Sequence, residues 1–180
     1  MVKTIDGISV NYIDEGEGEI VLLLHGWGAN ITLYRSVIDT LKQRRRVIAL
    51  DMPGFGKTPE PPAPWCVDDY VDFVLKFIAS FSITRLSVVV HSFGGRVFFK
   101  MNARDNLPFT VERAVLIDSA GILPKKSFGQ KVSLRCYKIG RAFMSTRVMH
   151  FLYPDAVEDM RRKRGSSDYN NATPLMRSTL

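Results

Sequence analysis

Apolar positions follow two different periods along the first 120 residues of this 180-residue chain. Residues 3–16 alternate apolar and polar side chains around Asp6 and Gly7, a pair typical of a tight turn, so we expect two short strands joined as a hairpin. Further along, four runs are mostly apolar, which is typical of strands buried on both faces. These runs lie at residues 20–26, 46–51, 85–91 and 111–121.

Helical patterns separate these runs. Residues 30–43 place apolar side chains three and four residues apart after Asn30, a suitable N-terminal cap. Residues 67–81 carry acidic side chains in their early turns, where the helix dipole favours them, and a third helix is expected at 93–104. Strands and helices that alternate in this way predict an α/β fold, with a mostly parallel sheet flanked by helices.

Both the pattern and the charge change near residue 120. Residues 1–120 are the predicted α/β core, with 13 Lys and Arg against 14 Asp and Glu, whereas residues 121–180 carry 12 against 4 and are expected to form only helices. A nucleic-acid surface is one interpretation of this basic excess, and solvated helix faces are the other. The second is favoured, because the chain has no aromatic-rich RNA-binding pattern, recognition helix or zinc motif.

Other features exclude several classes of protein. No apolar run is long enough to span a bilayer, and residues 1–10 do not resemble a secretory leader, so a cytoplasmic location is expected. Cys66 and Cys136 lie outside any disulfide or metal motif and are predicted to be reduced thiols. The three histidines, His25, His91 and His150, lack metal-ligand spacing. We expect no metal, no cofactor, no nucleic-acid partner and no membrane span.

Ser92 lies between an apolar strand and a helix, with Gly94 two residues later. A catalytic serine must be exposed on a sharp turn, next to a base and to donors for an oxyanion, and small neighbours permit that turn. Val90 stands where the G-x-S-x-G pattern has its first glycine, so the match is partial, and Val90 is expected to crowd the turn. The alternative interpretation is that Ser92 only caps the helix.

Two further loops resemble those of a known family. His25 to Gly28 follows the first buried strand, and Asp51 to Gly56 follows the second. Together with Ser92, they resemble the α/β-hydrolase superfamily over about residues 5–180, in particular members with an HGxG loop and a helical cap, such as esterases and carbon–carbon bond hydrolases. A dinucleotide-binding loop is excluded, because the glycines after His25 lack the third member of that motif.

The resemblance implies roles for individual residues. Ser92 matches the nucleophile, and the backbone N–H groups of Phe93 and Trp27, with Gly26 in the same loop, match the oxyanion hole and substrate-binding region. Asp118 matches a position where some members keep the catalytic acid. His25 and His91 are expected to hold loops by hydrogen bonds rather than to catalyse.

The resemblance also implies a C-terminally truncated member. The family places two more strands and its catalytic histidine after the cap, whereas this chain ends within residues 121–180, which match the cap. We therefore expect a serine hydrolase of small carboxylic esters whose turnover is weak or absent. A non-catalytic module that binds a small apolar ligand is the alternative, and a nucleic-acid or anionic-surface binder is a third hypothesis.

The strand at Arg113 to Asp118 would lack its usual neighbour in such a chain. It is apolar on both faces and contains no proline, lysine or glycine bulge to protect an open edge. We therefore expect the chain to form a homo-oligomer through this edge.

Overall fold

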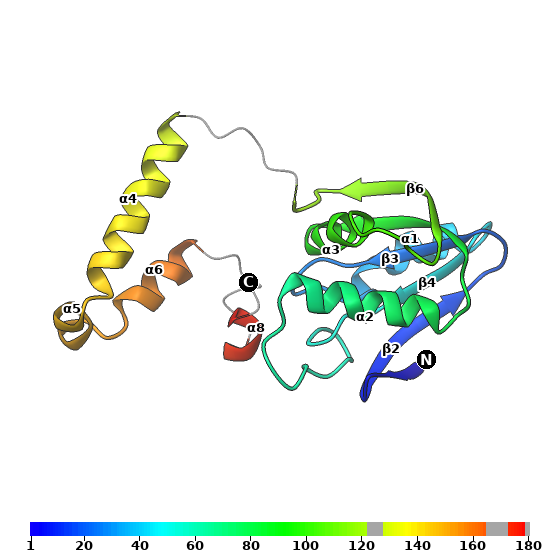
Figure 1. Cartoon of the computed structure of the whole chain (residues 1–180), viewed down its shortest axis with the longest axis horizontal. Helices are drawn as coiled ribbons and strands as arrows, with labels where there is room; N and C mark the ends of the chain where they lie inside the picture. Colours follow the sequence, from blue (N-terminus) through cyan, green and yellow to red (C-terminus); the bar gives the residue numbers. More distant parts are fainter. Residues whose placement is uncertain (122–127, 165–172, 179–180) are drawn as a thin grey trace. The chain divides into compact units, whose positions relative to one another are not determined.

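The computed structural model describes residues 1–121, 128–164 and 173–178 of the chain (Figure 1). The chain folds into two compact units. The first contains Met1–Ile122 together with Thr173–Leu180, and the second contains Leu123–Ala172.

A six-stranded sheet forms the centre of the first unit, in the order β1-β2-β4-β3-β5-β6. The pairs β3–β4, β3–β5 and β5–β6 are parallel, and the hairpin β1–β2 joins β4 antiparallel. The predicted mostly parallel sheet is therefore confirmed. The strands are β1 (Val2–Ile5), β2 (Ile8–Glu15), β3 (Ile20–Leu24), β4 (Arg46–Leu50), β5 (Arg85–His91) and β6 (Thr110–Ile117).

The turn between β1 and β2 has the predicted residues. Ile5 pairs with Ile8 across a two-residue loop, and Asp6 and Gly7 have φ angles of 48° and 79°. Positive φ at both positions is required by the tight hairpin turn that matches strand twist, which explains this pair of residues.

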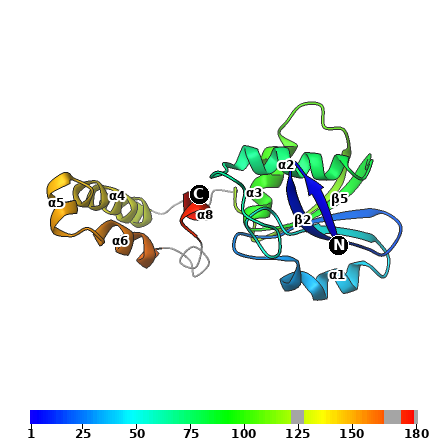
Figure 2. The same cartoon turned by 90° about the horizontal axis from the view of Figure 1, so that it is seen from below.

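Helices cover both faces of the sheet. Figure 2 shows α1 on one face and α2 and α3 on the other. The first predicted helix begins as a 3-10 turn, η1, where the Asn30 side chain accepts a hydrogen bond from the Thr32 N–H at 2.9 Å. The bounds are η1 (Ile31–Tyr34), α1 (Arg35–Leu41), α2 (Val67–Ala79) and α3 (Phe93–Asn102).

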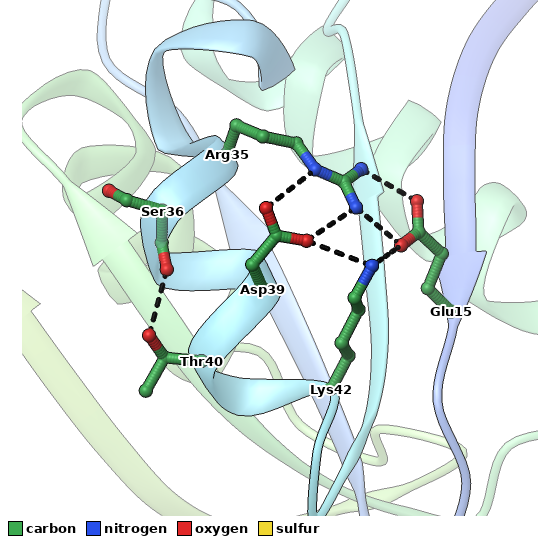
Figure 3. Close-up of polar contacts among 6 residues, drawn as sticks. All are labelled: Glu15, Arg35, Ser36, Asp39, Thr40 and Lys42. Atoms are coloured by element: carbon green, nitrogen blue, oxygen red, sulfur yellow. Dashed lines mark hydrogen bonds and ion pairs between the residues drawn. The ribbon is translucent and has the colours of Figure 1, made fainter.

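An ion-pair network attaches α1 to the end of β2 (Figure 3). Arg35 bonds both carboxylate oxygens of Glu15 at 2.7 Å and also reaches Asp39 at 2.6 Å, while Lys42 bonds Glu15 at 2.7 Å and Asp39 at 2.8 Å. The hydrogen bonds from these two cations lower the pKa of both carboxyl groups to about 2.

Strand β6 lies at the edge of the sheet and is exposed. Val115 is 52 % exposed, and Leu116 and Ile117 are each 40 % exposed. The expectation that this strand is buried on both faces is wrong, whereas the predicted open edge is confirmed, because among the described residues β6 pairs only with β5. A register shift also places an extra residue on β6, between Val111 and Ala114, so the strand has an irregularity that does not depend on glycine.

The described residues after Gly121 form only helices, as predicted. The second unit contains α4 (Phe128–Met144), α5 (Arg147–Leu152) and α6 (Ala156–Arg164). Helix α8 (Pro174–Ser178) belongs to the first unit, where Met176 is buried. None of the helices in the described residues is long and apolar enough to cross a bilayer. The division near residue 120 and the role of residues 121–180 as a cap stay predictions.

Candidate active site

The sheet reverses its strand order at β3. Strand β4 lies on one side of β3 and β5 on the other, so the loops after β3 and β5 leave in opposite directions, an arrangement that opens a crevice at the carboxyl ends of parallel strands. Gly26 follows β3 and Ser92 follows β5. A β-carbon on Gly26 would lie 3.2 Å from Cβ of Ser92 and 2.6 Å from Nδ1 of His91, so the two predicted loops are in direct contact.

Ser92 has an unusual backbone conformation. Its φ and ψ angles are 45° and −110°, a backbone conformation that residues other than glycine rarely adopt. The surrounding chain holds it there, because the Ser92 N–H donates to the Ile117 carbonyl at 3.1 Å and its carbonyl accepts from the N–H groups of Gly95 and Ala120 at 3.0 and 2.9 Å. Within the described parts of the chain, Oγ of Ser92 has no hydrogen-bond partner.

The glycines after Ser92 are required by packing. A β-carbon on Gly94 would lie 2.3 Å from the Leu24 carbonyl oxygen, and one on Gly95 would lie 2.4 Å from Oγ of Ser119. Val90, at the departure from the expected pattern, is fully buried in β5 between Leu24 and Leu116 of the neighbouring strands. Its crowding effect on the turn stays a prediction.

Trp27 and Phe93 bring two unpaired backbone donors to this crevice. No described residue accepts a hydrogen bond from either backbone N–H. Their rings meet edge to face at 5.4 Å, and the Trp27 ring also packs on Phe55 at 4.9 Å. The indole Nε1 of Trp27 is buried without a partner among the described residues. Phe93 starts α3, whose dipole favours negative charge at that end.

His25 is fully buried and uses both ring nitrogens structurally. Its Nε2 accepts from the Met52 N–H at 2.9 Å, so Nδ1 carries the proton and donates to the Gly26 carbonyl at 2.7 Å. Burial lowers the pKa of His25 and so favours this neutral form. The prediction that His25 holds its loop by hydrogen bonds is confirmed.

The other histidines differ in their surroundings. Nδ1 of His91 lies 2.8 Å from the Tyr34 hydroxyl. No sequence pattern singles out Tyr34, because only the folded chain brings η1 and β5 together. His150 lies in α5 of the second unit, and its side chain is outside the described residues.

Asp51 organises the loop after β4. This carboxylate is only 2 % exposed and accepts hydrogen bonds from the backbone N–H groups of Ile31 and Lys57 at 2.8 and 2.9 Å and from the Asn11 side chain at 2.7 Å. Asp51 therefore connects β2, η1 and its own loop. Its role in this structure is to position the loops beside the crevice.

Asp118 directly follows β6 and has a φ of 42°. It is exposed, and no hydrogen bond to its side chain occurs among the described residues. Its neighbour Ser119 was not singled out in the sequence, yet its Oγ is buried against Gly95 without a hydrogen-bond partner in the described structure. The catalytic role of Asp118 stays a prediction.

A cavity of about 410 Å³ lies elsewhere in the first unit. Trp65 and Cys66 line it at the start of α2, and Arg96 and Lys100 line it from α3. Ser92 does not line this cavity. Both cysteines, Cys66 and Cys136, are free and exposed, and no metal-ligand cluster occurs among the described residues.

These strands, loops and glycines define the class of fold. The sequence pattern of the alpha/beta hydrolase fold family matches residues 19–177, and the chain belongs to this family.

Several relatives are similar to this chain over about two thirds of its length. The 2-hydroxy-6-oxo-2,4-heptadienoate hydrolase of Pseudomonas putida is 35 % identical over 120 residues, covering 64 % of this chain and 43 % of that protein. The 2-hydroxymuconate semialdehyde hydrolase of Pseudomonas sp. is 36 % identical over 120 residues, covering 64 % and 42 %.

This chain is also similar to solved structures of hydrolases. A meta-cleavage product hydrolase from Pseudomonas fluorescens IP01 superposes with a TM-score of 0.60 at 33 % identity, covering 68 % of this chain and 46 % of that one. The chain thus spans less than half the length of these three relatives.

Proposed function

We propose that this protein is a serine hydrolase that acts on small carboxylic esters through Ser92. The observation that carries the proposal is the strained backbone of Ser92, held between β5 and α3 by three hydrogen bonds. Strain of this kind persists only where the surrounding structure enforces it, and it is common at catalytic positions. A serine that only capped α3 would not need this conformation, and the Ser92 side chain makes no capping hydrogen bond.

The proposed reaction proceeds through an acyl-enzyme. Oγ of Ser92 forms a bond to the acyl carbon while its proton passes to a base, and the carbonyl becomes an oxyanion. The unpaired N–H groups of Phe93 and Trp27, beside Gly26, are the proposed donors to that oxyanion. Collapse of the intermediate breaks the bond to the alkoxy oxygen, the alcohol leaves with the proton, and water then releases the carboxylic acid.

The described histidine rings of the first unit are engaged in hydrogen bonds. Both ring nitrogens of His25 are occupied, and Nδ1 of His91 is bonded to Tyr34. We assign Asp118 as the acid of the catalytic group, which leaves the position of the base unassigned. Serine proteases that lose their triad retain only about 10³–10⁴-fold acceleration over water, so we expect turnover by this chain to be weak.

Cleavage of a carbon–carbon bond is a second candidate reaction. Two relatives that are 35 and 36 % identical are named as hydrolases of a 2-hydroxy-6-oxo dienoate and of a hydroxymuconate semialdehyde. Because the chain spans less than half of those proteins, their substrates are hypotheses for this one. The non-catalytic alternative, a module that binds a small apolar ligand, needs the crevice but no base.

One experiment separates these possibilities. Purified wild type, Ser92→Ala and Ser9→Ala would be assayed with short-chain p-nitrophenyl esters and with a 2-hydroxy-6-oxo dienoate. Ser9 is an exposed serine on β2 and serves as the control. Ester turnover that is lost only in Ser92→Ala supports the proposal. Turnover of the dienoate alone supports the second candidate, and equal rates in all three proteins would reject a catalytic Ser92.

A further inference from the structure

Helix α4 is basic along its whole length. It spans 17 residues, contains four lysines and arginines, and contains no aspartate or glutamate. At 1.5 Å per residue such a helix is about 25 Å long, enough to lie along an extended surface. Two of its cations, Arg135 and Lys138, are exposed and make no ion pair within the described part of the chain.

One face of α4 packs inside the second unit. Leu134, Tyr137 and Met144 are half-buried, and a β-carbon on Gly140 would lie 3.6 Å from Cε of Met160 in α6. Figures 1 and 2 both show α4 alongside α6. This face of α4 therefore contacts α6 of the same unit.

A different face of α4 carries an exposed apolar stripe. Val132, Ile139 and Phe143 are 45, 63 and 59 % exposed, and Cys136 between them is also exposed. Their spacing of four, three and four residues places all four on one side of the helix. Arg135 precedes Ile139 by one turn and Lys138 follows Arg135 by three residues, so the cations form a row along the edge of the stripe.

We propose that this stripe, Val132 to Phe143 on α4, docks on an anionic lipid surface. An amphipathic helix with basic residues beside an apolar face lies in the interface of such a bilayer, with its apolar side chains among the lipid tails and its cations at the headgroups. The exposed apolar stripe and the cations beside it together favour an anionic lipid surface over other partners. A nucleic acid would use the cations but leave Ile139 and Phe143 in water, and a second α4 would bring like charges together, because the helix has no acidic residue.

The two cysteines provide a direct test with a built-in control. Cys136 lies in the stripe, Cys66 immediately precedes α2 in the first unit, and both are exposed. An environment-sensitive fluorophore would be attached to the single remaining cysteine of Cys66→Ser and of Cys136→Ser. Vesicles of phosphatidylcholine and phosphatidylglycerol are expected to shift the emission of the label at Cys136 to the blue and to leave the label at Cys66 unchanged. No shift at Cys136, or equal shifts at both positions, would overturn the proposal.

Flotation with the same vesicles measures the contribution of charge. Each cation near such a surface strengthens binding about fivefold, so Arg135→Gln/Lys138→Gln is expected to bind roughly 25-fold more weakly. Arg44→Gln/Arg113→Gln removes two exposed charges of the first unit and is expected to bind as the wild type does. Ile139→Ser/Phe143→Ser is expected to lose binding with no change in net charge. Equal losses in both charge variants, or tighter binding to an oligonucleotide that Ile139→Ser/Phe143→Ser leaves intact, would contradict a lipid partner.

Discussion

The α-carbon of Gly94 packs directly against the Leu24 carbonyl, where an added β-carbon would lie 2.3 Å from the oxygen. Leu24 ends β3, so this contact joins the strand before the HGxG-type loop to the helix that begins after Ser92. The backbone contact leaves no room for a side chain at residue 94, and it fixes how closely the two loops approach.

Gly94→Ala is therefore expected to destabilise the first unit. Overpacking typically lowers the free energy of unfolding by about 1–3 kcal/mol. We expect a value at the upper end, because the added β-carbon meets the Leu24 backbone rather than a flexible side chain. Thermal unfolding would measure the loss. Gly129→Ala in α4 is the matched control, since a β-carbon there meets nothing within 4 Å and alanine favours a helix. Equal stability of Gly94→Ala and wild type would show that β3 and α3 leave room for a β-carbon at residue 94.

Asp51→Asn is expected to lower the free energy of unfolding by about 3 kcal/mol or more. The two carboxylate oxygens of Asp51 accept hydrogen bonds from three donors. An asparagine side chain has only one acceptor oxygen, so its NH₂ group would face at least one of these donors. Urea unfolding would measure the change. Asp105→Asn, at an exposed position, is the control and is expected to be neutral. A neutral Asp51→Asn would contradict the positioning role of this carboxylate.

Acid is expected to weaken the attachment of α1. The folded-state pKa values of Glu15 and Asp39 are lowered to about 2 from 4.5 and 3.8. Their contribution to stability is therefore complete above pH 4.5 and is lost progressively as the pH falls toward 2, because the unfolded state binds protons first. The groups are partly exposed, so salt is expected to reduce the effect.

Urea unfolding of wild type and Glu15→Gln across this pH range would test the network. The variant is expected to show a shallower loss of stability with acid, whereas Glu17→Gln, at an exposed carboxylate without an ion pair in the described structure, is expected to follow the wild type. Identical pH dependence in wild type and Glu15→Gln would show that the ion pairs are not maintained in solution.

The open edge of β6 is expected to pair with β6 of a second copy. Val115 is central to the regular part of this strand and 52 % exposed, so Val115→Lys places a charge in the proposed contact. Light scattering coupled to size exclusion should show a dimer for the wild type and a monomer for Val115→Lys. Leu33→Lys, an equal change at an exposed position on η1, should remain dimeric. A monomeric wild type at micromolar concentrations would reject this interface.

Local chemistry explains which features could be predicted from the sequence. The turn at Asp6 and Gly7 and the approach of the loops containing Gly26 and Ser92 depend on short motifs whose residue types have few structural uses. The strand at β6 was predicted from its apolar pattern, and its open edge from the missing neighbour. The pattern alone is typical of a strand buried on both faces, because burial depends on which elements pack against a strand.

Contacts between distant segments could not be predicted in this way. Tyr34 bonds His91, and Met176 fills the space at Gly54, where a β-carbon would lie 2.3 Å from its sulfur. Neither pair has a sequence pattern, since each arises only when separate elements fold together. The same reason left Ser119 unnoticed beside Gly95.

The reactivity of Ser92 is the central claim, and a fluorophosphonate probe tests it most directly. The probe forms a covalent bond to an activated serine, and peptide mapping by mass spectrometry identifies the residue. The account predicts slow labelling of the wild type and of Ser9→Ala, confined to Ser92, and none of Ser92→Ala. Labelling that persists in Ser92→Ala, or a wild type that stays unlabelled after long incubation, would contradict it.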